Sequence, residues 1–287
     1  MKKGWRAMIN RRDFLKTSAS AAFGGFLMNN LQARAAMAGT KSLGKIGVQL
    51  YTVRDLMKQD FAGTLKKVAT VGYQEVEFAG YFDNKPEDVK KLLDDLGLTA
   101  PAVHVGIDLL RDKLDTTLET AKIIGHKYIV CPWLAPPDRA LEKYKEHAAL
   151  FNKVGEACQK AGFQFAYHNH DFEFEAQDGK IPYDLLLAET DPKLVQMELD
   201  LFWIRKGGQD PLAYFEKHPG RFPLCHVKDM TEDEKMVEVG AGKIDFAQIF
   251  SHSKHAGLKH YFVEHDNPGD ALQSITASYQ HLKKLKF

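Results

Sequence analysis

Residues 163–170 read Phe-Gln-Phe-Ala-Tyr-His-Asn-His, an apolar run that ends in two histidines one residue apart. Three later runs of strand length also end in side chains that can bind a metal ion. They cover residues 195–200, 222–228 and 261–264. The first two end in Glu-Leu-Asp and His-Val-Lys, and the last ends in the Glu-His-Asp of residues 264–266. Because strand residues two apart point to the same face, each run can direct one or two ligands toward a common point.

The same kind of run recurs along the chain after residue 39 and alternates with stretches of helical pattern. Most of the runs are continuously apolar, which is typical of parallel strands covered on both faces. The helical stretches begin after residues such as Asp60 and Asp210 and end at glycines such as Gly72 and Gly97. We expect strands at residues 46–52, 75–79, 100–106, 128–133, 163–170, 195–202, 222–228 and 261–264. We expect helices at residues 61–71, 86–96, 109–124, 139–160, 183–188, 211–217, 246–255 and 270–284.

Eight strands that alternate with eight helices in about 250 residues match an α/β fold of the (β/α)8 TIM barrel type. A doubly wound open sheet is the alternative, and it usually carries a glycine-rich loop after its first strand. The residues that follow the first run here, 49–54, contain no glycine. The sequence therefore predicts one barrel domain over residues 39–287.

The first 38 residues differ from the rest of the chain. Residues 10–16 read Asn-Arg-Arg-Asp-Phe-Leu-Lys, and a weakly apolar stretch over residues 17–31 and two Ala-x-Ala patterns follow. The segment resembles a twin-arginine export signal. That resemblance predicts cleavage near Ala35 or Ala38, passage through the twin-arginine translocation machinery and a periplasmic mature protein. A basic amphipathic helix at the start of the domain is the alternative.

The charge and hydropathy of the chain argue against some classes of partner. The first 38 residues carry a formal charge of +6 and the whole chain +1, which leaves −5 on the body. A mildly acidic body argues against a nucleic-acid partner, since binding to phosphates needs a basic face. No apolar run in the body is long enough for a stable membrane anchor. Cys131, Cys158 and Cys225 show no framework spacing and are expected to be buried apolar residues.

Six segments in a fixed order identify a resemblance to a known family. They are residues 47–51, 72–77, 167–170, 199–200, 226–229 and 263–264, which read GVQLY, GYQEVE, YHNH, LD, HVKD and VE. From residue 46 to its C-terminus the chain resembles the xylose isomerase-like sugar phosphate isomerase/epimerase family. The resemblance implies a divalent ion, Mn²⁺ first with Zn²⁺, Co²⁺ or Mg²⁺ as alternatives, held at the carboxyl ends of strands five to eight.

The family usually holds this ion through a Glu, an Asp, a His and a Glu. By position, Asp200, His226 and Glu264 match the last three ligands. The first Glu position falls on His168, so an imidazole is expected there, with His170 as the alternative ligand facing the substrate. The same resemblance makes Glu264, His168 and His170 candidates for proton transfer, since histidine and carboxylates serve that role near neutral pH.

Several further residues are candidates whose role the sequence leaves open. Lys228 is expected either to hold a substrate oxygen or to pair with Glu198 or Asp266. Glu198, one layer below Asp200, is expected to support a histidine or to act in catalysis. Substrate contacts are expected from His104, Trp133, Glu77, Tyr51 and Trp203, with a core or surface position for His104, a helix salt bridge for Glu77 and rim packing for the aromatic residues as alternatives.

These features predict a metal-dependent sugar isomerase or epimerase, or a related lyase. Its expected substrate is an unphosphorylated keto sugar or 3-keto-glycoside, converted through a metal-stabilised enediolate. Export and the lack of a basic cluster both favour a substrate without phosphate. The alternatives are an enzyme like the abasic-site endonucleases and a non-catalytic periplasmic sugar-binding protein. A homo-oligomer is compatible with the sequence.

Overall fold

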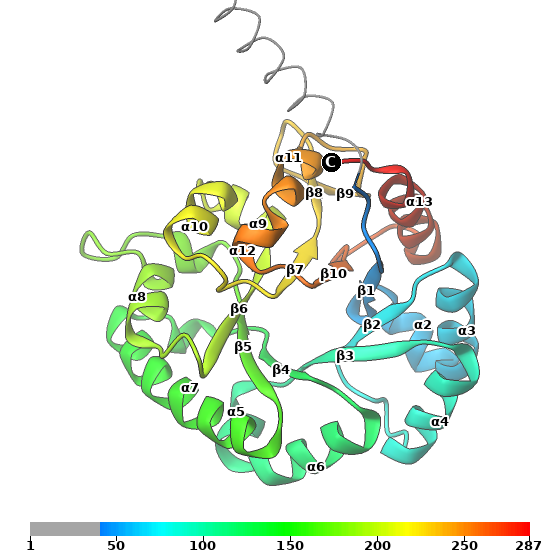
Figure 1. The fold of residues 1–287 in the computed structure, drawn as a ribbon, viewed down its shortest axis with the longest axis horizontal. Helices are drawn as coiled ribbons and strands as arrows, with labels where there is room; N and C mark the ends of the chain where they lie inside the picture. Colours follow the sequence, from blue (N-terminus) through cyan, green and yellow to red (C-terminus); the bar gives the residue numbers. More distant parts are fainter. Residues whose placement is uncertain (1–40) are drawn as a thin grey trace, which may run out of the picture. The chain divides into compact units, whose positions relative to one another are not determined.

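The computed structural model describes residues 41–287, and Leu43–Leu285 form one compact unit. Eight parallel strands close into a barrel in the order β1-β10-β7-β6-β5-β4-β3-β2, with helices around the outside (Figure 1). The predicted TIM barrel is therefore confirmed. The barrel strands are β1 Gly47–Gln49, β2 Glu75–Phe78, β3 Thr99–His104, β4 Tyr128–Cys131, β5 Gln164–His168, β6 Val195–Asp200, β7 Leu224–Val227 and β10 His260–Val263.

The strand register places the expected ligands at one end of the barrel. His168 on β5 pairs with Glu198 on β6, and Asp200 on β6 pairs with His226 on β7. His226 in turn pairs with Phe262 on β10, two residues before Glu264. Because the carboxyl ends of parallel strands share one end of a TIM barrel, these side chains converge there.

Several predicted helix boundaries agree with the structure. The bounds of α3 Phe61–Val71, α4 Pro86–Leu96 and α10 Pro211–Lys217 agree with the prediction at both ends. Asp60 and Asp210 cap their helices by accepting from the backbone N–H of Gly63 and Leu212. The remaining long helices are α7 Leu141–Ala161, α8 Pro182–Glu189 and α13 Ala271–Lys284.

Two predicted helices are each divided. The stretch 109–124 forms α5 Ile107–Asp112 and α6 Leu114–Ile124, because Lys113 leaves the helical region at φ −139° and ψ 34°. The stretch 246–255 forms α11 Phe246–Ser251 and α12 Ser253–Ala256.

Other segments were predicted with the wrong type or length. The first strand ends at Gln49, whose side chain accepts from the backbone N–H of Tyr51 and starts a 3-10 helix, Leu50–Val53. The strand predicted to reach residue 202 ends at Asp200, which caps α9 Leu201–Lys206. The sequence did not predict α2 Arg54–Gln59, the short helices Pro136–Asp138 and Phe172–Phe174, or the hairpin of β8 Asp229–Met230 and β9 Met236–Val237.

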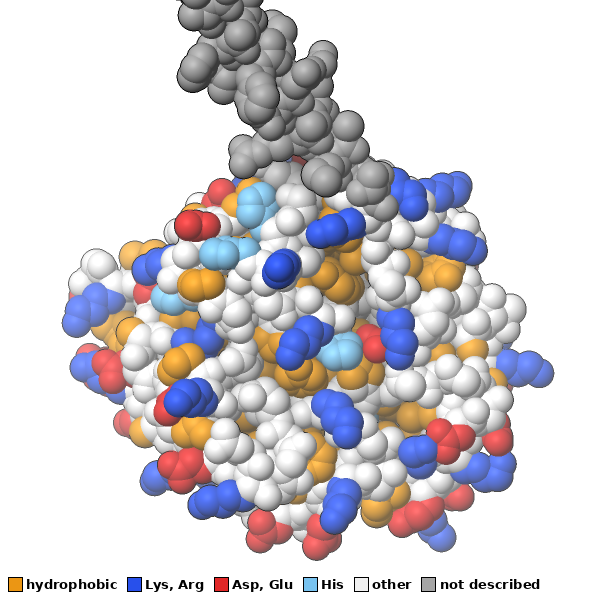
Figure 2. Space-filling view, viewed as in Figure 1, with side chains coloured by type: hydrophobic (Ala, Val, Ile, Leu, Met, Phe, Trp, Pro, Cys, Tyr) orange, Lys and Arg blue, Asp and Glu red, His pale blue; other side chains and the backbone are white. Residues whose placement is uncertain are grey.

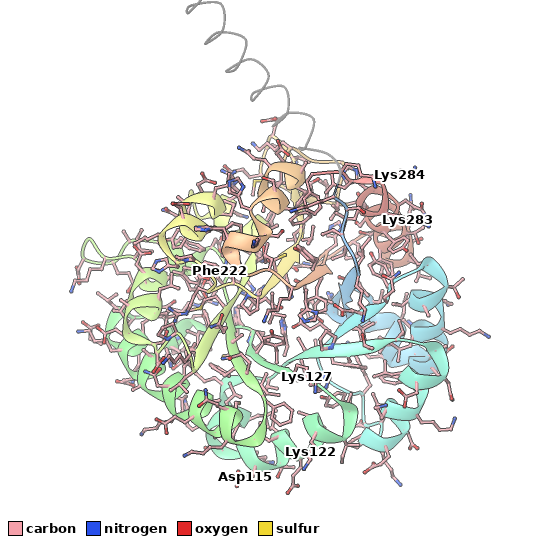
Figure 3. The ribbon with its side chains drawn as sticks, in the orientation of Figure 1. Asp115, Lys122, Lys127, Phe222, Lys283 and Lys284 are labelled. Atoms are coloured by element: carbon pink, nitrogen blue, oxygen red, sulfur yellow. The ribbon has the colours of Figure 1, made fainter. Side chains whose placement is uncertain are left out.

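An apolar layer fills the barrel below the site. It consists of Ala102, Tyr128, Val130, Ala166, Leu224 and Phe262, all buried. Figure 3 shows Phe222, which precedes β7, nearer the centre of the view than Asp115 and Lys122 of α6, which lie at the periphery.

The three cysteines are buried free thiols, as predicted.

The surface charge and the length of the helices concern two kinds of partner, nucleic acids and membranes. On the face drawn in Figure 2, Lys and Arg side chains are scattered among acidic and uncharged ones rather than gathered in a continuous band. Within residues 41–287, no helix combines the length and apolar character needed to cross a bilayer.

One histidine outside the site makes the fold sensitive to acid. His126, in the turn before β4, is buried. Its Nδ1 donates to the carbonyl oxygen of Ala100 at 2.6 Å, and its Nε2 accepts from the Tyr81 hydroxyl at 2.8 Å. Burial lowers the pKa of His126 to about 4 from an ordinary 6.5. Folding therefore favours the neutral ring, and the stability this ring contributes is lost as the pH falls from 6.5 toward 4.

Acidification from about pH 7 to about pH 4 lowers the unfolding free energy of the parent. We predict that this decrease is about 3 kcal/mol smaller in His126→Asn. Urea unfolding of both proteins at the two pH values measures this difference. The exposed His252, changed to Asn, serves as the control and is expected to leave the pH dependence as in the parent. Parallel pH profiles for the parent and His126→Asn would contradict the assignment.

Candidate metal centre and its cavity

A cavity of about 650 Å³ opens at the carboxyl end of the barrel strands. Most of its lining residues come from the loops that follow β1, β2, β3, β4, β5, β7 and β10. They are Tyr51, Ala79, Gly80, His104, Gly106, Pro132, Trp133, His168, His170, Lys228, Glu264, Asp266 and Asn267.

Four of the predicted ligands meet at the floor of this cavity. Nε2 of His168 lies 3.3 Å from Oδ2 of Asp200, and Nδ1 of His226 lies 2.8 Å from Oε2 of Glu264. One ligand atom from each of the four lies within 4.8 Å of all the others. The convergence expected from the strand ends is thus present in the structure, and it brings together two imidazoles and two carboxylates.

Neighbouring groups fix the direction of each ligand. Oδ1 of Asp200 accepts from the backbone N–H groups of Phe202 and Trp203 at 2.9 and 2.8 Å, which leaves Oδ2 for the site. Nδ1 of His168 donates to the carbonyl oxygen of Pro132 at 3.1 Å, so the lone pair of Nε2 faces Asp200. These tautomers follow from the hydrogen-bond partners.

A second group of side chains lies one layer deeper. Nε2 of His226 lies 2.7 Å from Oε2 of Glu77 and 3.3 Å from Oε2 of Glu198. His104 Nε2 lies 2.9 Å from Glu198 and 3.4 Å from Glu77, and Gln49 donates to Glu77 at 2.8 Å. Glu198 therefore contacts two histidines, which agrees with the expectation that it supports a histidine. The helix salt bridge considered for Glu77 is wrong, because its side chain is buried inside the barrel.

Lys228 pairs with three carboxylates. Its Nζ lies 3.0 Å from Asp200 Oδ2, 2.5 Å from Glu264 Oε2 and 2.7 Å from Asp266 Oδ1. The expected pair with Asp266 is present. The pair considered with Glu198 is not among these contacts, because Glu198 lies one layer deeper, at the level of His104.

The charges of the floor follow from burial and from these contacts. Burial would raise the pKa of Glu264, but Lys228 and His226 outweigh it and hold that pKa well below its ordinary value. Burial and the charge on His226 keep the pKa of His168 well below 6.5. At neutral pH, Glu264 is therefore ionised and His168 neutral, which are the forms that bind metal ions.

His226 differs, because burial lowers its pKa but Glu198 and Glu264 outweigh burial and raise it well above 6.5. A cation bound at Nδ1 would replace a proton on this ring.

The cavity walls are polar and aromatic. Tyr51 and Trp133 are 42% and 45% exposed and line the cavity, so rim packing alone does not describe them. An arginine lies over each ring, Arg54 at 4.0 Å from the centroid of Tyr51 and Arg139 at 5.1 Å from Trp133. Trp203 is not among the lining residues.

Two further residues line the cavity. His170 lines it with its ring 5.3 Å from that of Trp203, and burial and His168 lower its pKa to about 2. Asp266, which the sequence offered as a metal-capable residue at a strand end and as an ion-pair partner of Lys228, also lines the cavity. Its spacing of two residues from Glu264 was the signal that both face the same side.

The donor set fits a divalent metal. Two imidazole nitrogens and two carboxylate oxygens suit Mn²⁺, Zn²⁺ or Co²⁺ better than Mg²⁺, which prefers oxygen ligands. Both imidazoles also contact further acceptors, Pro132 for His168 and Glu77 for His226, as metal-binding histidines usually do.

Known proteins resemble this chain, a curated relative over part of it and solved structures over most of it. A curated inosose dehydratase of Clostridium tetani is 30% identical over 128 residues, which cover 38% of this chain and 42% of that protein. The chain thus spans less than half the length of this relative. The structure of a sugar phosphate isomerase/epimerase from Parabacteroides distasonis is 28% identical with a TM-score of 0.71, and the match covers 85% of this chain and 96% of that one.

A structure of the IolI protein with a bound zinc atom shares the fold at 17% identity and a TM-score of 0.65, over 82% of this chain and 95% of that one. The sequence profile of the xylose isomerase-like TIM barrel family matches residues 65–285. Since that match covers most of the barrel, whose floor gathers the expected ligands, this chain belongs to the xylose isomerase-like TIM barrel family.

Proposed function

We propose that the protein is a divalent-metal-dependent sugar isomerase, epimerase or related lyase that acts on an unphosphorylated keto sugar or 3-keto-glycoside. The observation that carries the proposal is the convergence of His168, Asp200, His226 and Glu264 at the floor of an open cavity. Family membership and the similarity to sugar-converting enzymes support it.

The four converging residues would hold the metal, with Mn²⁺ as the expected ion. His168 is preferred to His170 as the ligand, because its Nε2 faces Asp200 while His170 lines the cavity wall. When bound, such an ion acts as a Lewis acid that polarises the substrate carbonyl and acidifies the neighbouring C–H bond.

Residues of the cavity would move the proton. Glu264 faces the cavity and removes the proton from the carbon beside the carbonyl. Lys228, 2.5 Å from Glu264, donates a hydrogen bond to the substrate oxygen on which negative charge develops. His170 belongs to the loop after β5, three strands from Glu264 in the barrel order, and would face another side of the sugar as a neutral ring.

The cavity chemistry favours a neutral sugar. Among the described residues that line it, Lys228 is the one cationic side chain, and three carboxylates already surround it. The described lining therefore lacks the cluster of lysine and arginine side chains that commonly binds a phosphate. The exposed rings of Tyr51 and Trp133 offer apolar faces for the C–H surfaces of a sugar, and Asp266 and Asn267 offer polar groups for its hydroxyls.

The export signal is part of this proposal. Residues 1–38 lie outside the described residues, so support for export comes from the sequence alone. Cleavage near Ala35 or Ala38 would leave a barrel domain over residues 39–287 in the periplasm.

We predict that Glu264→Gln lowers the rate of substrate-proton exchange about 100-fold or more, because it removes both the base and a charged metal ligand. The measurement is deuterium uptake from D₂O by a panel of unphosphorylated keto sugars and 3-keto-glycosides, with Mn²⁺-loaded protein. Glu232→Gln, at an exposed glutamate paired with Lys243, is the matched control and should keep the parent rate. No exchange with any member of the panel would count against the proposed reaction.

We predict that Lys228→Met binds Mn²⁺ about tenfold more tightly or better than the parent, because it removes a positive charge beside two ligand oxygens. In chelator the same variant should lose about 3 kcal/mol of stability, since three buried or part-buried carboxylates lose their partner. Calorimetric titration and thermal unfolding measure the two effects. Lys217→Met, at a surface lysine 3.4 Å from Asp184, should change neither. Weaker Mn²⁺ binding by Lys228→Met is the result that contradicts the placement of the ion.

We predict that the double change Arg11→Lys and Arg12→Lys stops export, because the paired arginines carry the export motif. Cell fractionation followed by mass spectrometry of the mature N-terminus measures this outcome. A single change at Lys3, to Arg, is the control and should leave export intact. Unchanged periplasmic delivery of the double variant would show that another signal is used.

A further inference from the structure

The layer beneath the proposed metal site has the composition of a second one. It contains Glu77 on β2, His104 on β3 and Glu198 on β6, and it shares His226 on β7. One ligand atom from each of these four lies within 4.8 Å of all the others. The nitrogen-to-oxygen separations within the group's ion pairs run from 2.7 to 3.4 Å.

His226 contributes a different atom to each layer. Its Nδ1 faces Glu264 at 2.8 Å, and its Nε2 faces Glu77 at 2.7 Å. The two ring nitrogens therefore point to the upper and the lower group, and the deprotonated ring, an imidazolate, is able to serve both.

Imidazoles balance the charges of the two buried carboxylates in the lower layer. The side chains of Glu77 and Glu198 are 0% exposed, and that of His104 is 9% exposed. Across residues 41–287, both carboxylates have histidines as their ion-pair partners and no lysine or arginine. Beneath them lies the apolar layer that includes Leu224 and Phe262.

An independent observation points to a ligand in this layer. Oε1 of Glu77 and Oε1 of Glu198 are both buried, and within the described part of the chain neither has a hydrogen-bond partner. Buried carboxylate oxygens are nearly always satisfied, and leaving a charged group unsatisfied is costly. Two such orphaned oxygens belong to the same four-residue group, whose remaining members are imidazoles.

We propose that Glu77, His104, Glu198 and Nε2 of His226 hold a second divalent cation, bridged to the ion of the upper site through the His226 ring, which gives up both of its ring protons to solvent and bridges as an imidazolate. Two carboxylates and two imidazoles suit Mn²⁺, Zn²⁺ or Co²⁺, and their two negative charges match a dication. With four protein ligands the lower site is closed, as in structural sites, so its ion offsets buried charge and fixes His226 rather than binding substrate. This inference goes beyond the proposed function, which needs the upper ion alone.

The test is the number of Mn²⁺ ions bound by the full chain. We expect two ions per chain in the parent by elemental analysis after gel filtration, and magnetic coupling between them in the electron paramagnetic resonance spectrum. Glu198→Gln and Glu77→Gln should each reduce the count to one. Glu75→Gln is the matched control, because Glu75 lies two residues before Glu77 on the same strand but pairs with His260, and it should keep both ions.

The variant Glu264→Gln distinguishes the two sites, because Glu264 belongs to the upper site alone. If this variant keeps one ion that Glu198→Gln lacks, the second site is supported. One uncoupled ion in the parent, retained by Glu198→Gln and lost in Glu264→Gln, overturns the second site and leaves the proposed function standing. No ion in the parent overturns both. The ion count and the spectrum of the parent decide the question, so a variant that fails to fold leaves the test intact.

Discussion

The imidazole of His226 is the contact on which the site depends. It lies at the centre of the barrel mouth with Glu264 on one ring nitrogen and Glu77 on the other, and both contacts are shorter than 3 Å. A buried imidazole between carboxylates is stable only if its charge and theirs balance. Every other feature of the floor, including the position of Lys228 between Asp200 and Glu264, adjusts that balance.

The fold creates this charge density by its geometry. Parallel strands in a closed barrel direct alternate side chains inward in layers, and the layer formed by Ala102, Val130, Leu224 and Phe262 closes the barrel below the site. Polar residues one layer higher therefore have apolar groups beneath them and an open cavity above. Low local polarity strengthens each charge interaction there, which is useful for chemistry that generates negative charge on a substrate.

Part of this arrangement could be predicted from the sequence because it depends on local rules. The apolar runs and their two-residue alternation located the strands and put Asp200, His226 and Glu264 at the same end of the barrel. Helices with an Asp cap and a clear stop, such as α3 and α10, had the predicted bounds. The break at Lys113 could not be predicted, because the residues on both sides of it favour helix.

The deeper layer was harder to predict because it depends on stagger between strands. Glu77, His104 and Glu198 are separated by up to 121 positions in the chain, and nothing in each strand alone says that their side chains share one level. The sequence placed Glu77 at the barrel mouth, whereas the structure buries it against His226. Similarly, Asp266 entered the analysis as an ion-pair partner although it also lines the cavity.

The central claim is that one divalent ion is shared by His168, Asp200, His226 and Glu264. A crystal grown with Mn²⁺ and measured at the manganese absorption edge tests it most directly. The account predicts an anomalous peak in bonding contact with Nε2 of His168, Oδ2 of Asp200, Nδ1 of His226 and Oε2 of Glu264. A floor with no peak, or a peak that contacts fewer than three of these atoms, would contradict it.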